Sequence, residues 1–412
     1  MPRRCLPRFA SLLAAFAVAV LASCGPAMVP APIANPQSPY FGRYPPAPAA
    51  PPAAAGPQKV ALLLPLSGAN AQLGQAIFDA AQLALFEAGA DRLTLLPRDT
   101  GGSAAGAASA AHAVIAEGVH LILGPLLAPE VEAVKSIARD AHVNVIAFST
   151  VTSLAGGNVF LMGFLPRQEV IRAVSYARQR GLRRFAALAP NSPYGHLTAD
   201  ALQEAISSSG GTAKKVEFFD PDAADPAPAV QRLMSGGPGL GDGALPAAAG
   251  PVPAFDALLL PEGGAQLRLI ARAVRAPGAE AQPVQLLGSG LWDTPDIGNE
   301  PALVGGWFAA SPPEARQEFE ERFSATYGHR APRLASLGYD AAALAAVLAR
   351  AAGGEAFSQQ AILNPNGFTG VDGLFRFTSN GLVQRGLAVL EVEPQGAVVI
   401  SPAPQSFQDV AF

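Results

Sequence analysis

Cysteine is almost absent from this 412-residue chain, which contains only Cys5 and Cys24. Both lie ahead of the part whose composition is that of a globular protein, so a disulfide bond or a thiolate metal site is excluded there. Charge is also sparse: 15% of residues are charged, the formal net charge is −4, and no cluster of lysine or arginine occurs outside the N-terminus. Nucleic acid is therefore not an expected partner.

Motifs for catalysis and for cofactors are missing as well. The five histidines show no HExxH or other metal-ligand spacing, and the sequence has no GxSxG nucleophile elbow. The Gly/Pro/Ala stretch 236–253, expected to be a surface loop, has neither a GxGxxG in the required register nor a phosphate-loop lysine. We therefore expect no enzyme activity, no catalytic residue, no metal site and no cofactor.

The N-terminus has the pattern of a targeting segment. Three arginines precede an apolar stretch, residues 9–20, that is too short to span a bilayer. Residues 21–24, Leu-Ala-Ser-Cys, then match the lipobox of bacterial lipoproteins. This resemblance implies a signal peptide over 1–23 and a membrane anchor through acylated Cys24. Gly25 after the cysteine implies an outer-membrane lipoprotein facing the periplasm; the alternative is an ordinary signal peptide with an incidental cysteine.

A linker follows the lipobox. In residues 24–57 about a third of the positions are proline and most others are alanine, glycine or small polar residues, with no apolar periodicity. In a polyproline II conformation, at ~3.1 Å per residue, this segment would reach roughly 100 Å. The segment is predicted to hold the globular part, residues 58–404, away from a membrane.

The globular part opens on a strand–loop–helix unit, Lys59 to Gly89. Val60–Leu64 is an apolar run typical of a strand covered on both faces, Pro65 ends it, and an amphipathic helix follows up to Gly89. Ligands bind beyond the carboxyl ends of such strands, so Ser67 and Asn70 in the loop are candidate ligand contacts. The alternative is that they only cap the helix and solvate the loop.

The same order of strand, proline, polar loop and helix occurs twice more, at 184–211 and 255–278. Further apolar strands alternate with helical stretches along the rest of the chain. This alternation predicts an α/β fold with parallel, helix-covered sheets, and the wide spacing of the three units predicts two such sheets.

The motifs of these units resemble those of a known family, the type I periplasmic binding proteins of the leucine/isoleucine/valine-receptor branch. The resemblance implies two lobes, each a parallel sheet flanked by helices, joined by three crossovers with a ligand cleft between them. It places the first lobe at about 58–165 plus 289–353, and the second at about 166–288 plus 354–404. The motifs that carry it are PLSG…LG at 65–74, ILGP at 122–125, NVIAFST at 144–150, PNSPYG at 190–195, PEGGAQL at 261–267, LGYDAA at 337–342 and GVDGLFRFTSNG at 370–381.

The resemblance also implies site residues. Ser149, Thr150 and Thr152 match positions at which amino-acid receptors of the family hold a ligand carboxylate. Glu262 matches the acid that holds the ammonium group, and Tyr194 matches a frequent cleft aromatic. For Glu262 the alternative is an acid that only faces a helix N-terminus. The sequence departs from the family at residues 126–128, where Leu-Leu-Ala replaces a serine pair.

Two functions follow from these features. The lipobox and the long linker resemble the lipoprotein activators of bifunctional penicillin-binding proteins, so we expect first a non-catalytic activator or scaffold for a peptidoglycan synthase. The alternative is the substrate-binding lipoprotein of an ABC transporter for an amino acid or a similar small ligand. The expected partners are accordingly the membrane, through Cys24, and a penicillin-binding protein or an amino-acid-like ligand.

Overall fold

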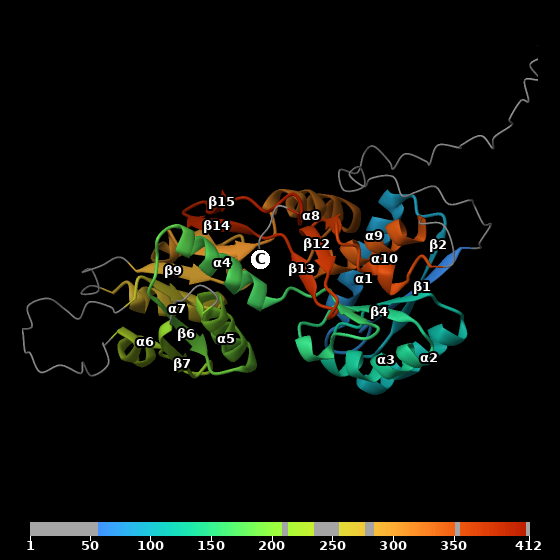
Figure 1. The fold of residues 1–412 in the computed structure, drawn as a ribbon, viewed down its shortest axis with the longest axis horizontal. Coiled ribbons are helices and arrows are strands. Elements are labelled where there is room, and N and C mark those ends of the chain that lie inside the picture. Colours follow the sequence, from blue (N-terminus) through green and yellow to red (C-terminus); the bar gives the residue numbers. More distant parts are fainter. Residues whose placement is uncertain (1–56, 208–212, 235–254, 277–283, 351–354, 409–412) are drawn as a thin grey trace, which may run out of the picture.

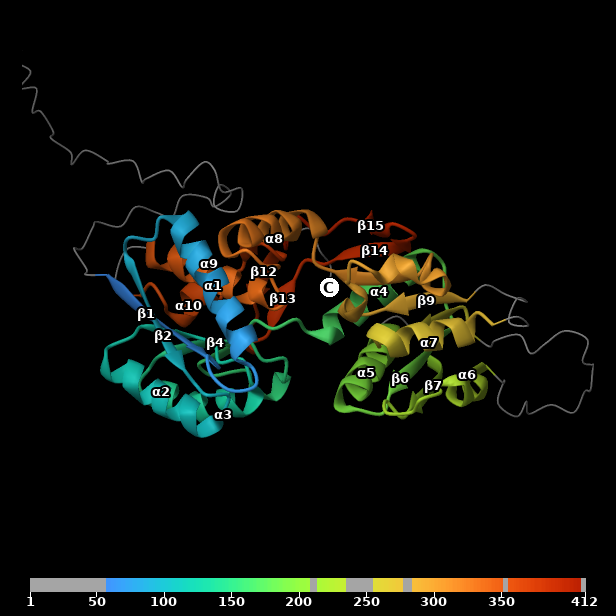
Figure 2. The same cartoon turned by 180° about the vertical axis from the view of Figure 1, so that it is seen from behind.

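The computed structural model describes residues 57–207, 213–234, 255–276, 284–350 and 355–408. The signal peptide, the lipobox cysteine Cys24, the linker up to residue 56 and the stretch 236–253 lie outside the described residues. The described chain forms two α/β lobes side by side, and the same two lobes are seen from behind (Figures 1 and 2). Within these ranges no helix has the combination of length and apolar character needed to cross a bilayer.

The first lobe is built on a five-stranded parallel sheet in the order β2-β1-β3-β4-β5. Pro97 lies in β2, where an edge position tolerates the missing N–H. Alternate residues of β1 face opposite helical layers: Leu62 packs with α1 and α9, whereas Leu63 packs with α2 and α3. The bounds are β1 Gln58–Leu64, β2 Leu93–Asp99, β3 Leu121–Leu123, β4 Asn144–Ala147, β5 Val159–Leu161, α1 Ala71–Ala88, α2 Ala104–Ala116, α3 Ala128–Asp140, α8 Pro313–Tyr327, α9 Ala335–Arg350 and α10 Gln359–Ile362.

The second lobe has a seven-stranded sheet in the order β15-β14-β10-β9-β8-β6-β7. Strands β6 to β10 are parallel, but β14 and β15 are antiparallel, so this sheet is mixed rather than purely parallel as predicted. The bounds are α4 Pro166–Gln179, β6 Phe185–Pro190, α5 Pro193–Ser207, β7 Ala213–Phe219, α6 Ala227–Met234, β8 Ala257–Leu259, α7 Gly264–Val274, β9 Gln285–Gly288, β10 Trp307–Ala310, β14 Ala388–Glu393 and β15 Gly396–Ser401.

The chain passes three times between the lobes, as expected, but two predicted boundaries are wrong. Residues 289–310, expected in the first lobe, belong to the second, because β10 pairs with β9 and Phe308 lies in the core of the second lobe. Residues 355–383, expected in the second lobe, belong to the first, because their aromatic side chains pack in its core. They include a small antiparallel sheet of β11 Phe368–Gly370, β12 Gly373–Phe377 and β13 Val383–Arg385. The crossovers therefore lie at 162–165, 311–312 and 386–387.

Polar side chains tie the first and third crossovers together. The Gln168 side chain donates to the carbonyl of Val383 and accepts the N–H of Arg385 at 3.1 Å. Arg172 donates through Nε to the carbonyl of Leu387 at 3.0 Å. Because both side chains come from the first helix after the first crossover, the two connections are held as one unit.

The opening unit is confirmed at its ends. Strand β1 stops at Leu64, before Pro65, and α1 ends at Gly89. Gly89 is in the left-handed region, with φ of 56°, and its N–H bonds to carbonyls of the last turn of α1.

Candidate functional site

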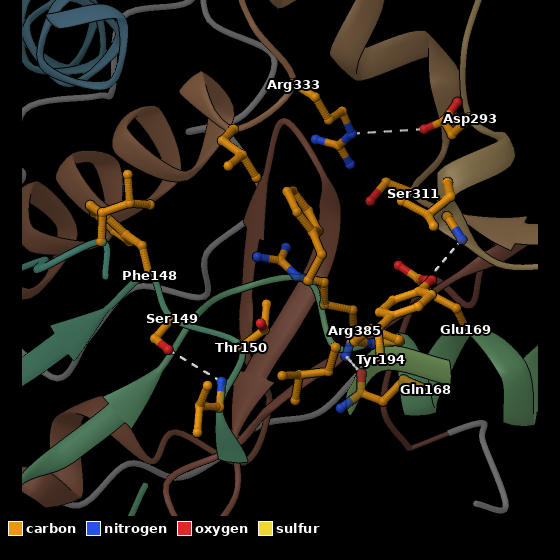
Figure 3. Close-up of a pocket in the computed structure, with 18 of the residues that line it drawn as sticks. Phe148, Ser149, Thr150, Gln168, Glu169, Tyr194, Asp293, Ser311, Arg333 and Arg385 are labelled. Carbon is orange, nitrogen blue, oxygen red and sulfur yellow. Dashed lines mark hydrogen bonds and ion pairs between the residues drawn. The ribbon is translucent and has the colours of Figure 1, made fainter. Parts of the chain in front are cut away.

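A cavity of about 510 Å³ lies where the three crossovers meet. All three crossovers contribute to its walls, through Phe164, Ser311 and Leu387. Loops from both lobes complete it, so the cavity is a cleft between the lobes (Figure 3). Its volume falls within the range of sites that enclose small molecules.

The two sides of the cavity differ in chemistry. The first lobe contributes a mainly apolar wall, whereas the second lobe, the second crossover, the loop before α9 and the end of β13 contribute a polar wall. We call these the apolar wall, made of Leu73, Leu126, Leu127, Phe148 and Val151, and the polar wall, made of Gln168, Glu169, Tyr194, Asp293, Ser311, Arg333 and Arg385.

Of the predicted site residues, Asn70, Ser149, Thr150 and Tyr194 line the cavity. Ser149 is buried, and its Oγ accepts the N–H of Val151 at 3.2 Å, whereas Thr150 is exposed. The hydroxyl of Tyr194 is 2.7 Å from Ser289 Oγ. Tyr194 is held there by Gly195, where a Cβ would lie 1.8 Å from the carbonyl oxygen of Pro190.

Ser67, Thr152 and Glu262 are not among the lining residues. Asp99 Oδ1 accepts the N–H groups of Leu66, Ser67 and Gly101 at 2.8, 3.2 and 2.8 Å, so Ser67 serves to fix its own loop. The side-chain hydrogen bond from Ser67 is also the main cause that lowers the pKa of Asp99.

Thr152 and Glu262 also make local contacts. Thr152 begins a 3₁₀ turn, η1 Thr152–Leu154. Glu262 Oε1 accepts the N–H of Gly263 at 2.9 Å, next to the start of α7. The contact expected between Glu262 and a ligand therefore has no support from the lining of this cavity, and a local role beside the helix explains its position.

The sequence interpretation missed a buried charge cluster beside the cavity, formed by Arg333, Arg385, Asp340 and Asp372. Arg333 Nη2 lies 2.9 Å from Asp372 Oδ1, and Arg385 Nη1 lies 4.0 Å from Asp340 Oδ2. Both guanidinium groups also stack near the ring of Phe164, at 3.9 and 4.9 Å from its centroid. Buried charges need partners, and Asp340 and Asp372 supply them to the two arginines that line the cavity.

Burial changes the protonation of the acids in this region. It raises the pKa of Asp340 to about 7, aided by repulsion from Asp372. For Asp372 burial acts in the same direction, but the guanidinium groups of Arg333 and Arg385 outweigh it and the pKa is lowered. Burial also raises the pKa of Glu169 to about 7, although its Oε2 accepts the N–H of Gly290 at 2.7 Å. Below about pH 7 the two aspartates therefore share roughly one negative charge, carried by Asp372.

One ion pair joins the lobes across the cavity. Asp293 follows β9 in the second lobe, and both its oxygens bind Arg316 of α8 in the first lobe, one of them at 2.9 Å from Nη2. Arg333 Nε lies 3.8 Å from the same carboxylate (Figure 3). The side chains of Arg316 and Asp293 are only 15% and 10% exposed, so the pair is shielded from solvent.

One signal in the sequence points to these residues. Asp340 and Asp372 each stand alone among apolar and small residues, within LGYDAA and GVDGLF. An isolated charge in such a setting is buried with a partner or serves a site. Among the described residues no group of histidine, cysteine, aspartate and glutamate is arranged to hold a metal ion.

Comparisons with known proteins agree with the fold and the position of the cavity. A family profile described as periplasmic binding protein matches residues 57–397. An uncharacterised protein of Rickettsia prowazekii (strain Madrid E) is 23% identical over 162 residues, which is 39% of this chain and 43% of that protein.

Two solved structures share the fold. One is a Rhodospirillum rubrum protein named provisionally as a branched-chain amino acid ABC transporter, with 20% identity, a TM-score of 0.72 and coverage of 84% of this chain and 100% of that one. The other is a solute binding protein of an ABC transporter from Rhodopseudomonas palustris BisB5 in complex with 3,4-dihydroxy benzoic acid. It has 20% identity and a TM-score of 0.60, and covers 84% of this chain and 96% of that one. At these identities the likeness establishes the fold.

Proposed function

Because this chain belongs to the family of type I periplasmic binding proteins, we propose that it is a non-catalytic envelope protein whose cleft takes up a small ligand between its lobes for transport. The observation that carries the proposal is a pair of buried polar groups on the polar wall, Ser311 Oγ and Arg385 Nε, which have no hydrogen-bond partner among the described residues. Leaving such groups unpaired costs free energy, and a ligand in the cleft would supply the missing partner.

The proposed function predicts stabilisation by a ligand. A ligand present at 100 times its Kd would raise the free energy of unfolding by about 2.7 kcal/mol, and the Tm by a few degrees. Melting should be measured with a panel of amino acids, amides, and aliphatic and aromatic acids. The variant Ala128→Trp, which places an indole in the cavity, should lose any shift, whereas Ser136→Trp on the exposed face of α3 should keep it. A shift that survives in Ala128→Trp would contradict binding in this cleft.

The activator role expected from the sequence is a second proposal, and the lipobox and the Pro/Ala-rich linker support it. In that role the folded lobes would contact a penicillin-binding protein, and the cleft would stay without a small ligand. Capture of a penicillin-binding protein by the lipidated protein, together with no melting shift from the whole panel, would favour the activator over the transport role.

We propose in addition that Cys24 anchors the protein to the outer membrane, since the lipobox specifies acylation of that residue. Cys24→Ser is expected to leave the precursor uncleaved by the lipoprotein signal peptidase and without a lipid anchor. Membrane fractionation after a high-salt wash measures the outcome. A variant that remains in the membrane fraction with a cleaved N-terminus would show that an ordinary signal peptide is used.

A further inference from the structure

We propose that the ligand of this cleft is a carboxylate with an apolar body and no neighbouring ammonium group, and that Arg385 and Ser311 hold the carboxylate. The proposal rests on the proposed function, because it names the ligand class of the same cleft. It assigns the charged end of the ligand to Arg385 at the end of β13 and Ser311 in the second crossover, and not to Ser149 and Thr150 after β4.

The first step is the state of Arg385. Its side chain is only 2% exposed, and one of its nitrogens, Nη2, donates to the carbonyl of Met162 at 2.8 Å. Nε and Nη1 have no hydrogen-bond partner among the described residues, and Oδ2 of Asp340 lies 4.0 Å from Nη1, beyond hydrogen-bond distance. A guanidinium group forms its strongest hydrogen bonds with carboxylates, in pairs of parallel N–H donors.

The second step is the position of Ser311. This residue lies in the second crossover, is 3% exposed, and has an Oγ without a hydrogen-bond partner among the described residues. Figure 3 shows its hydroxyl and the guanidinium of Arg385 on walls of the same cavity. A hydroxyl can donate to a carboxylate oxygen, so the two residues together offer donors to one. The nearby acids already have partners: Glu169 Oε2 accepts the N–H of Gly290 at 2.7 Å, and Asp372 lies 2.9 Å from Arg333.

The third step concerns the acids of the polar wall. Both oxygens of Asp293 bind Arg316, and Glu169 accepts the N–H of Gly290. Glu262, the residue expected to hold an ammonium group, lies outside the lining and accepts the N–H of Gly263. An α-amino acid would therefore bring a buried ammonium group into a cleft whose acids already have partners, at a cost in desolvation.

The fourth step is the apolar wall. Leu73, Leu126, Leu127, Phe148 and Val151 present hydrocarbon to the cavity from the first lobe. At residues 126–128 this wall reads Leu-Leu-Ala and offers no side-chain hydroxyl to a carboxylate. The hydrocarbon body of a ligand would pack there, while its carboxylate faces the opposite, polar wall.

Calorimetric titration with three matched probes tests the proposal: hexanoate, hexanamide and norleucine, with benzoate and benzamide as an aromatic pair. Wild-type protein is expected to bind at least one carboxylate ten or more times more tightly than its amide, and hexanoate more tightly than norleucine. Ser311→Ala should weaken carboxylate binding several-fold and Arg385→Lys more than tenfold. Ser136→Ala, on the exposed face of α3, should bind as the wild type does.

The outcomes distinguish failure of the proposed ligand class from failure of the proposed binding function. Equal binding of acid and amide, or tighter binding of norleucine, overturns the ligand class while the proposed binding function stands. Carboxylate binding that is unchanged in Ser311→Ala overturns the assignment of the site. Because this variant removes only one hydroxyl, it still tests the assignment if Arg385→Lys fails to fold. If neither these probes nor any member of the wider panel binds the wild type, the ligand class and the proposed function both fail.

Discussion

Asp293→Asn is expected to lower the free energy of unfolding by about 3 kcal/mol, because it removes the charge of the shielded carboxylate that binds both Nη atoms of Arg316. The carboxylate comes from the second lobe and the guanidinium from α8 of the first, so the loss falls on the contact between the lobes. Thermal unfolding should show a decrease in Tm of several degrees.

The matched control uses the same arginine. Glu320 lies one helical turn from Arg316, 3.6 Å from its Nε, and its side chain is 35% exposed. Glu320→Gln should therefore cost only about 0.3–0.5 kcal/mol, the usual value for an exposed pair on a helix. Equal losses in the two variants would show that the pair between the lobes is no stronger than a surface ion pair.

Asp372→Asn is expected to destabilise the protein by about 3 kcal/mol, whereas Asp340→Asn at pH 6 should cost less than about 1 kcal/mol. The reason is the unequal protonation of the two buried acids. The pKa of Asp372 is lowered, so this residue carries the charge that Arg333 and Arg385 need. The pKa of Asp340 is raised to about 7, so at pH 6 the side chain is mostly neutral, as asparagine is.

The pH dependence of stability is a second test of the unequal protonation of Asp340 and Asp372. A raised pKa in the folded state contributes stability that is fully present below the unfolded pKa and is lost as the pH rises through about 7. Asp340→Asn should therefore reduce the fall in stability between pH 4 and pH 8, measured by denaturant unfolding. A larger loss at pH 6 from Asp340→Asn than from Asp372→Asn would reverse the assignment of the shared charge.

The sequence predicts the strands and helices well where the chain carries its own boundary signals. The apolar run before Pro65, and Gly89 at the end of α1, give the opening unit almost to the residue. The fold class follows because repeated strand–loop–helix units have few arrangements other than parallel, helix-covered sheets.

The assignment of segments to lobes could not be made from the sequence. Strand β10 is an ordinary apolar run, and only its pairing with β9 places it in the second lobe. The aromatic residues of β12 suit either core, and their actual neighbours in the first lobe are set by contacts with α9, distant in the chain. Local patterns fix local structure, whereas these choices depend on packing between remote segments.

The candidate site shows the same limit. Tyr194 and Asn70 line the cavity because they follow strands whose carboxyl ends face the cleft, a position that the sequence predicts. Arg333 and Arg385 come from segments without a strand–loop–helix pattern. Their position at the cavity depends on how the chain returns between the lobes, which local patterns do not predict. Glu262 was expected in the cleft from the resemblance alone, and its hydrogen bond with Gly263 is a local one.

The interleaving of the lobes has a consequence for the order in which this chain can acquire its structure. The first lobe needs α8, α9 and β11–β13 to close the core begun by β1 and α1, and the second needs β14 and β15 to complete its sheet edge. An N-terminal fragment that stops before residue 313 therefore exposes one face of the first sheet. While the chain is exported, neither core can be complete until the C-terminal quarter has emerged. Until then, chaperones and proteases can reach the exposed apolar face of the first sheet.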